Sequence, residues 1–508
     1  MKRMLAMFLA LFMVLGATTL AACGQGEVET STGKPQASES DSERNTDARE
    51  ESTDSRESTT ESATGSETGS EPATETASET ETESESKRFT SEELESIREE
   101  LNRITVGKKL PIASFGASVK AENMQELYEL MLEAGINTVI TMDEIYNTTG
   151  EGNKLDLVLS TALATGMDVI VGARGFDGAT MEAKLSGRVE YFDIIKAIYL
   201  NDEPTPDSFD ALGKTRETLL ELLPGADKWQ MGANLLPLGI ASYEPGNKFG
   251  FETTGYEDTL RKYMESVQPD FLCFDYYPWT SGGTISHYLA NLFVVNKVAK
   301  DYEVPVYTFI EANYIDVSYS KLKLECNLSL ANGAQSLYLF LAMELGSHSA
   351  GVVFDSSGNV VNWGYYSVME EIFNGLHAMK GVFLDFDWQN SIFAGAAVQT
   401  YTDALKENDV DGFINESGSF GHLSSVASAD AVVGCFTDRD GVNALYVVNT
   451  DLSNNEFPAE TVLHFDGEIL YEIWGAEGLE EIGYADTLTL SLYAGDGKFI
   501  IMNPTLPQ

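Results

Sequence analysis

Basic residues, cysteine and histidine are scarce in this sequence. Its 508 residues include 32 Lys and Arg against 80 Asp and Glu, so the formal net charge is −48. A chain this acidic is repelled at long range by nucleic acid, which we therefore exclude as a partner. The chain has four cysteines, and the three beyond the N-terminal segment (Cys273, Cys326, Cys435) show no C-x-x-C spacing. We therefore expect no disulfide framework and no metal site, and predict that these three cysteines are small buried hydrophobes.

Common nucleotide-binding and hydrolase motifs are also missing. The sequence has no G-x-x-x-x-G-K-[ST], no G-x-G-x-x-G after a strand, no H-E-x-x-H and no G-x-S-x-G. It gives no reason to expect a cofactor. Hydrophobic residues make up 43% of the chain and aromatic residues 10%, which is ample for folded cores. Because a single core rarely serves more than about 250 residues, we expect at least two folded domains.

The N-terminal segment has the layout of a secretion signal. Lys2 and Arg3 precede an apolar run over residues 4–15, which is too short to span a bilayer. The sequence Leu20-Ala21-Ala22-Cys23-Gly24 resembles the lipobox of bacterial lipoproteins. The resemblance implies cleavage before Cys23, a lipid on its thiol, and a membrane-anchored protein on the extracytoplasmic face of the bacterial envelope. The alternative is a soluble secreted protein with a chance cysteine after the cleavage site.

Residues 23–88 are predicted to form a disordered tether that follows the signal peptide (1–22). Residues 24–86 consist mostly of Ser, Thr, Glu, Ala and Gly, with 18 acidic and four basic side chains. Such a segment cannot bury enough apolar surface to fold, and its own charge stretches it. The alternative is that this segment binds a specific partner instead of serving as a solvated spacer.

From Thr90 onward, short apolar runs alternate with segments of helical period. Thr90 and Glu93 form a capping-box pattern that opens the first helix. Eight strands are predicted, with helices between them: 111–116, 137–141, 168–172, 196–200, 228–233, 271–274, 305–310 and 335–341. Eight such units in some 270 residues favour a (β/α)8 TIM barrel, assigned to residues 89–384, over an open doubly wound sheet. A helix after the fourth strand is expected to begin at Pro206, capped by Thr205.

The remaining residues, 385–508, follow a different pattern. Apolar strands at 432–436 and 444–449 flank Asp438-Arg439-Asp440-Gly441, and a second pair flanks Ala494-Gly495-Asp496-Gly497. Asp-Gly between apolar runs is a strong hairpin signal. We expect an antiparallel β-sandwich domain here.

Chemistry in a TIM barrel sits where the strands end, so carboxylates at those positions are the candidate catalytic residues. The fourth strand leads into Asn201, Asp202 and Glu203, and alternation places Asn201 and Glu203 on the side of Tyr199. The seventh strand ends in Glu311. Two carboxyl groups facing across a cleft can act as general acid and nucleophile on a glycosidic bond, and a separation of about 5–5.5 Å gives retention.

Other residues at the strand ends are candidate substrate contacts. The sixth strand runs into Asp275, Tyr276, Tyr277 and Trp279, where aromatic rings can stack on sugars and Asp275 can accept hydroxyl hydrogen bonds. The competing interpretation is that the aromatic residues only pack against their neighbours and that Asp275 only caps the loop. Glu344, after the eighth strand, is an alternative candidate for the carboxylate role given to Glu311. Of the five histidines, only His287 and His348 fall near strand ends, and both are interpreted as surface or loop residues.

Asp202-Glu203-Pro204, the aromatic run and Glu311 together resemble the catalytic layout of clan A retaining glycoside hydrolases. The turn Leu330-Ala331-x-Gly333-Ala334-Gln335 is similar to that of family 42 β-galactosidases. The resemblance implies that Glu203 is the acid/base and Glu311 the nucleophile. In that clan an Asn usually precedes the acid/base, whereas this chain has Asp202 there, with Asn201 one position earlier.

The sequence therefore predicts a lipid-anchored retaining glycoside hydrolase that acts on an extracellular β-linked glycan. One alternative is a catalytically inactive glycan-binding lipoprotein, which Asp202 favours. Another is the solute-binding lipoprotein of a transporter, which requires two open α/β lobes.

Overall fold

The structure is a computed structural model that describes residues 88–506, apart from residues 118, 120, 143, 147–152, 239–252, 281, 347 and 407–410. The chain divides into two units, and every described residue belongs to the second, Glu85–Gln508. The predicted signal peptide, Cys23 and the tether up to residue 87 lie outside the described residues. Among the helices in the described part, none is both long and apolar enough to cross a bilayer.

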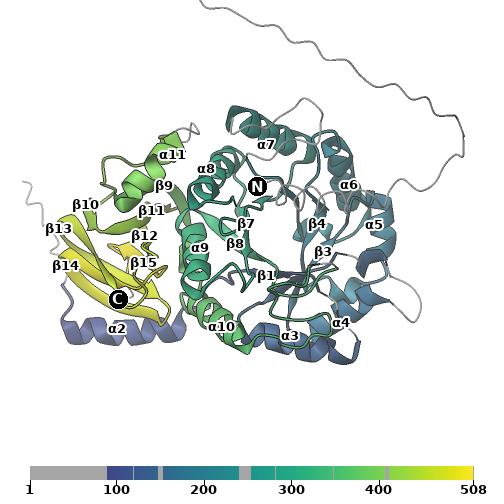
Figure 1. The fold of residues 1–508 in the computed structure, drawn as a ribbon, viewed down its shortest axis with the longest axis horizontal. Coiled ribbons are helices and arrows are strands. Elements are labelled where there is room, and N and C mark those ends of the chain that lie inside the picture. Colours follow the sequence, from purple (N-terminus) through teal and green to yellow (C-terminus); the bar gives the residue numbers. More distant parts are fainter. Residues whose placement is uncertain are drawn as a thin grey trace, which may run out of the picture. The chain divides into compact units, whose positions relative to one another are not determined.

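Eight parallel strands close into a barrel in chain order, which confirms the predicted TIM barrel (Figure 1). The strands are β1 (Ile112–Phe115), β2 (Thr138–Ile140), β3 (Asp168–Gly172), β4 (Ile195–Asp202), β5 (Gln230–Leu235), β6 (Leu272–Phe274), β7 (Val306–Glu311) and β8 (Ala334–Phe340). Each overlaps the segment predicted for it. The closed barrel excludes the two open lobes of a solute-binding protein.

The helices surround this barrel (Figure 1). They are α3 (Met124–Glu133), α4 (Lys154–Thr165), α5 (Gly178–Leu185), α6 (Phe209–Leu222), α7 (Thr253–Val267), α8 (Ile285–Asp301), α9 (Tyr319–Ala331) and α10 (Trp363–Ala378). The strands are apolar on both faces because one face fills the barrel interior, as Tyr199 and Phe309 do, and the other packs against helices, as Ile198 and Ile310 do. This alternation sends Glu311 into the interior row of β7.

Two details of the barrel differ from the sequence prediction. The helix after β4 begins at Phe209, not at Pro206, because Thr205 takes part in a turn in which its carbonyl accepts the Ser208 N–H at 2.9 Å. Helix α5 was missed. Its N-cap Asp177 accepts the Thr180 N–H at 2.9 Å, but the helix has only eight residues and so gives little periodic signal.

The C-terminal domain is the predicted antiparallel β-sandwich. Its seven strands are β9 (Phe386–Gly395), β10 (Leu423–Ser428), β11 (Asp430–Asp438), β12 (Asn443–Asn449), β13 (Ala459–Gly475), β14 (Gly478–Leu492) and β15 (Gly497–Met502). The short helix α11 (Asp403–Lys406) follows β9. One face of the strands encloses an apolar core that includes Val433, Leu445 and Ile500. The other face, with Val432 and Phe499, packs into the barrel's core.

Local features of the domain follow the predicted turn chemistry. Asp438 and Gly441 join β11 to β12: the Asp438 carboxylate accepts the Val442 N–H at 2.8 Å, and Gly441 adopts a φ of 84° that a side chain would disfavour. Cys273, Cys326 and Cys435 are buried free thiols, as predicted.

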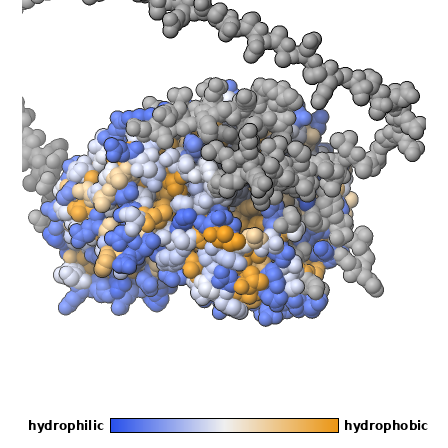
Figure 2. All heavy atoms as spheres, viewed as in Figure 1, coloured by the Kyte–Doolittle hydropathy of each residue, from blue (hydrophilic) through white to orange (hydrophobic). Residues whose placement is uncertain are grey.

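The first described helix, α2 (Ser91–Ile104), begins with the predicted capping box. The Thr90 N–H donates to Glu93 at 2.7 Å, and the Glu93 N–H donates to the Thr90 hydroxyl at 3.3 Å. Although its residues fall in the range assigned to the barrel, α2 packs against β14, where the Asn102 amide donates to the Leu479 carbonyl at 2.8 Å. Its outer face is hydrophilic (Figure 2).

Candidate active site

The end of β4 departs from regular alternation. The pairing of β4 with β5 shifts register between Tyr199 and Asp202, so the Asp202 carboxylate turns toward the barrel interior and accepts the Tyr199 hydroxyl at 2.7 Å. Glu203 follows with φ at 48°, a left-handed conformation that costs a non-glycine residue free energy, and its N–H donates to the Asn234 carbonyl at 3.0 Å. Strand alternation predicts that Asn201 and Glu203, but not Asp202, lie on the same side of β4 as Tyr199. That prediction is incomplete, because Asp202 also contacts Tyr199.

Asn201 supports this turn. Its side-chain oxygen accepts the Asp202 N–H at 3.0 Å, and the side chain lies beside Gly175, where an added Cβ would come within 3.8 Å of it.

A buried asparagine links the ends of three neighbouring strands. Asn234, on β5, donates to the Asp275 carboxylate at 3.0 Å and, over a longer 3.4 Å, to Asp202. The Asp275 carboxylate also receives a hydrogen bond from Tyr277. Sequence reasoning missed Asn234, although it stands near the end of the fifth predicted strand, where any polar side chain is informative.

Burial raises the pKa values of these carboxyl groups, and neighbouring carboxylates add to the rise at two of them. Burial raises the pKa of Asp275, and the neighbouring Asp202 adds to the rise. Burial, followed by the charges of Asp275 and Asp202, raises the pKa of Glu203 to about 8. Burial also raises the pKa of Asp202, and the hydrogen bonds from Tyr199 and Asn234 oppose that rise. Glu203 therefore carries a proton at neutral pH.

Glu311, at the end of β7, is only 3% exposed. One carboxylate oxygen accepts the backbone N–H groups of Trp279 at 3.0 Å and Thr280 at 3.2 Å, and the other accepts the Thr280 hydroxyl at 2.7 Å. Burial raises the pKa of Glu311, and these three hydrogen bonds oppose the rise because they favour the ionised form. The site thus supplies Glu311 with the partners that a carboxylate requires.

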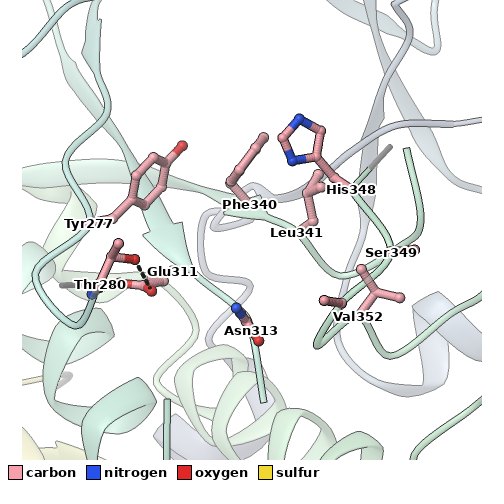
Figure 3. Close-up of a pocket in the computed structure, with 10 residues that line it drawn as sticks. Tyr277, Thr280, Glu311, Asn313, Phe340, Leu341, His348, Ser349 and Val352 are labelled. Carbon is pink, nitrogen blue, oxygen red and sulfur yellow. Dashed lines mark hydrogen bonds between the residues drawn. The ribbon is translucent and has the colours of Figure 1, made fainter. Parts of the chain in front are cut away.

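A cavity of about 210 Å³ opens beside Glu311 (Figure 3). In Figure 3, Glu311 and Thr280 lie on one side, with the Tyr277 and Phe340 side chains above them and His348 beyond Phe340. The Tyr277 and Phe340 rings are 5.2 Å apart, and the His348 ring meets Phe340 edge-on at 5.7 Å. His348 is in a loop, as expected, but it lines the cavity, a role the sequence did not indicate. The lining residues are Tyr277, Thr280, Glu311, Asn313, Phe340, Leu341, His348, Ser349, Ala350 and Val352.

The three aromatic residues after β6 do not all face the cavity. Tyr277 faces the cavity. Tyr276 packs toward helix α8, where its hydroxyl accepts the Thr284 N–H at 3.1 Å and its ring meets His287 edge-on at 6.4 Å. Trp279 contacts Glu311 through its backbone, not through its ring.

The predicted site residues therefore form two groups. Asp202, Glu203 and Asp275 make one, and Glu311, Trp279 and Tyr277 make the other, with Tyr277 connecting them through its bond to Asp275. The carboxylates that raise the pKa of Glu203 are Asp275 and Asp202, whereas the one that raises that of Glu311 is Asp316.

Glu344 belongs to neither group. Its carboxylate accepts the Ser356 N–H of its own loop at 2.8 Å. Within the described part of the chain, no group of three or more His, Cys, Asp and Glu side chains is arranged to hold a metal ion.

Comparisons with known proteins give matches at the level of structure. Neither the protein-family profiles nor the curated proteins include a match to this sequence. Gan42B, a family 42 β-galactosidase from G. stearothermophilus solved as a catalytic mutant, matches with a TM-score of 0.50 and 8% identity over 78% of this chain and 98% of that one. The likeness is one of fold alone.

Two other glycoside hydrolases match less closely. A family 39 enzyme from Bacteroides cellulosilyticus WH2 gives a TM-score of 0.46 at 10% identity, covering 78% of this chain and 81% of that one. The endo-β-1,4-mannanase from Thermotoga petrophila gives 0.39 at 13% identity, covering 77% and 99%. At a TM-score of 0.50, Gan42B shares its fold with this chain.

Proposed function

We propose that this protein is a retaining glycoside hydrolase that cleaves an extracellular β-linked glycan. The observation that carries the proposal is the contrast between two carboxyl groups at the same end of one barrel. Glu203 has a pKa of about 8 and holds a proton at neutral pH. Glu311 accepts three hydrogen bonds that favour its ionised form. A proton-bearing acid and an ionised nucleophile are what hydrolysis with retention requires.

In the proposed first step, a carboxylate oxygen of Glu311 attacks the anomeric carbon. The bond from that carbon to the leaving oxygen breaks, and the Glu203 proton passes to the leaving oxygen. In the second step, ionised Glu203 takes a proton from a water molecule whose oxygen attacks the anomeric carbon. The bond to Glu311 breaks, the sugar leaves with its original configuration, and both carboxyl groups return to their starting states.

Neighbouring side chains give each carboxyl group its role. Burial disfavours the ionised form of Glu203, and the nearby charges of Asp275 and Asp202 add to this, which keeps the proton on Glu203. Thr280 and the backbone of Trp279 orient the Glu311 carboxylate. Tyr277 and Phe340 offer an apolar wall beside Glu311 on which the C–H face of a sugar can pack.

The lipobox-like sequence at Cys23 supports a cell-envelope location for this activity. In this proposal a lipid on Cys23 anchors the protein to the extracytoplasmic face of the membrane, and the acidic tether allows the barrel to reach glycans beyond it.

The test is hydrolysis of a panel of activated aryl β-glycosides by the parent protein and by Glu203→Gln and Glu311→Gln. General acid/base assistance is worth about 10²–10⁴ in rate, so both variants should lose activity by at least that much on a substrate with a poor leaving group. Glu217→Gln, an exposed site on α6, is the matched control and should keep full activity. If no glycoside reacts while glycans bind equally to the parent and both variants, the inactive glycan-binding protein is the correct interpretation.

A further inference from the structure

The mechanism leaves one fully buried carboxyl group unused. Glu325, on α9, has no exposed surface, and both of its oxygens are hydrogen-bonded. One accepts the backbone N–H of Glu311 at 2.9 Å, and the other accepts the indole N–H of Trp279 at 2.6 Å. In the described part of the chain, no lysine, arginine or histidine forms an ion pair with it. A buried carboxyl group is costly unless such partners satisfy it, so its presence requires an explanation.

Both donors to Glu325 belong to the segments that carry and contact Glu311. Trp279 donates its indole N–H to Glu325 and its backbone N–H to the Glu311 carboxylate, the latter at 3.0 Å. Glu325 thus holds the Glu311 backbone directly and the Glu311 carboxylate through Trp279. Helix α9 also supplies Lys321, whose ammonium group lies 5.0 Å from the centre of the Trp279 ring. Trp279 is therefore fixed to α9 at two points.

The C-terminal domain in turn holds α9. The helix packs against β7 and β8 of the barrel and against β11, β12 and β15 of the C-terminal domain (Figure 1). Lys323 forms an ion pair with Asp496 in the turn before β15. Asn327 donates to the Gly495 carbonyl at 2.9 Å and accepts the Tyr446 hydroxyl at 2.8 Å.

This contact requires a glycine. At Gly495 an added Cβ would lie 2.7 Å from the Ser320 carbonyl oxygen and 2.8 Å from the Leu324 nitrogen, and φ there is 78°. The turn therefore approaches the α9 backbone more closely than any side chain would allow.

We propose that Glu325 is a positioning residue that fixes Glu311 and its hydrogen-bond donors, and that the C-terminal domain keeps Glu325 in place by clamping α9. The inference rests on the proposed function, in which Glu311 is the nucleophile. By holding Trp279 and Thr280 against Glu311, this arrangement keeps Glu311 ionised despite its burial and aims it at the sugar.

The surroundings of Glu325 act on its pKa in both directions. Burial raises the pKa of Glu325 well above its usual range, and the neighbouring Glu311 charge acts in the same direction. The hydrogen bonds from the Glu311 N–H and the Trp279 indole oppose this rise.

The experiment compares three single variants and one double variant of the full chain, solubilised in a nonionic detergent. Glu325→Gln keeps the size of the side chain, but its amide NH₂ cannot accept an N–H donor, so one of the two hydrogen bonds is lost. Trp279→Phe keeps a ring and the backbone N–H but removes the indole donor. Cys326→Ala is the matched control: it alters the next residue of α9, which is equally buried and does not contact Glu311 or Trp279 through a hydrogen bond in the described structure.

With an aryl glycoside that the parent hydrolyses, Glu325→Gln should lower kcat by about tenfold to a hundredfold and leave KM nearly unchanged. It should also move the acidic limb of the kcat/KM profile upward by about 1 in pH, because Glu311 loses part of the support for its charge. Trp279→Phe should shift the limb in the same direction, and the double variant should be little worse than Glu325→Gln because the two act through one contact. If the acidic limb of Glu325→Gln lies at the same pH as that of Cys326→Ala, the proposal is overturned.

A second measurement does not depend on activity. The emission spectrum of the parent minus that of Trp279→Phe isolates Trp279 from the other four tryptophans. Subtracting the spectrum of the double variant Glu325→Gln/Trp279→Phe from that of Glu325→Gln isolates the Trp279 emission in the absence of Glu325. This emission should be red-shifted and more readily quenched by acrylamide than in the parent. If the parent hydrolyses nothing, the proposed function fails; a changed Trp279 spectrum then still supports Glu325 as the residue that holds this segment, and an unchanged one overturns that as well.

Discussion

Replacing Glu203 by Gln should stabilise the fold in a pH-dependent manner. The pKa of this carboxyl group rises from 4.5 to about 8 on folding. When a carboxyl pKa is raised in the native state, the folded protein binds more protons than the unfolded one, and its stability falls as pH rises through that window. Below about pH 4.5 both states are protonated and the penalty vanishes, whereas above about pH 8 it is complete.

The size of the effect follows from the width of that window. At about 1.4 kcal/mol for each factor of ten in proton affinity, the penalty is about 3 kcal/mol at pH 7 and about 5 kcal/mol at pH 9. Because Gln carries no charge, the Glu203→Gln variant does not have this penalty. The unit Glu85–Gln508 has 424 residues, and an unfolding entropy of about 2 cal/mol/K per residue gives about 0.9 kcal/mol/K. We therefore expect Glu203→Gln to raise Tm by about 3 °C at pH 7 and about 5 °C at pH 9.

Thermal unfolding of the Glu85–Gln508 unit at pH 4, 7 and 9 measures this directly. Glu217→Gln, which is exposed on α6, is the control and should give differences near zero throughout. A Glu203→Gln difference that is flat with pH, or that grows toward acid, would refute the assignment of Glu203 as a group kept protonated by burial and by its carboxylate neighbours. Because no substrate is involved, the result stands whichever sugar the protein acts on.

Four further outcomes follow from the same contacts. The kcat/KM profile should be bell-shaped, with the basic limb near pH 8 because Glu203 loses its proton there, and the acidic limb above the usual Glu range because burial raises the pKa of Glu311. Asp275→Asn should move the basic limb downward by about 1 in pH, as titrated with the same substrate, since Asp275 is the charge that raises the Glu203 pKa most. Asn234→Ala should lower Tm by an amount equivalent to about 1–3 kcal/mol, because two carboxylates lose a shared donor. Cys23→Ser should release the protein from membranes into the soluble fraction on cell fractionation, and retention would contradict lipid anchoring.

The fold was predictable from sequence because its signals are local and repeated. Parallel strands buried on both faces read as short apolar runs, and each of the eight appears at its predicted place. Since such strands end at one rim, Glu203, Asp275 and Glu311 could be assigned to that rim before any distance was known.

What could not be predicted depends on contacts between segments far apart in the chain. The register shift at the end of β4 turns Asp202 inward, and alternation alone does not indicate it. Tyr276 and Trp279 look like sugar platforms in sequence, yet their positions are set by Thr284 and by Glu325, 46 residues away from Trp279. Glu325 sits on an almost wholly buried helix, where hydrogen bonds from Glu311 and Trp279, which lie on other segments, satisfy its carboxyl group.

The most direct test of the central claim is to identify the carboxylate that becomes glycosylated. The parent protein is incubated with an activated 2-deoxy-2-fluoro glycoside of the sugar that the panel identifies, and the adduct is located by mass spectrometry of its peptides. The account predicts one glycosyl group on Glu311, and none in Glu311→Gln. A label on Asp275 or Glu203, or turnover with inverted configuration and no adduct, would contradict it.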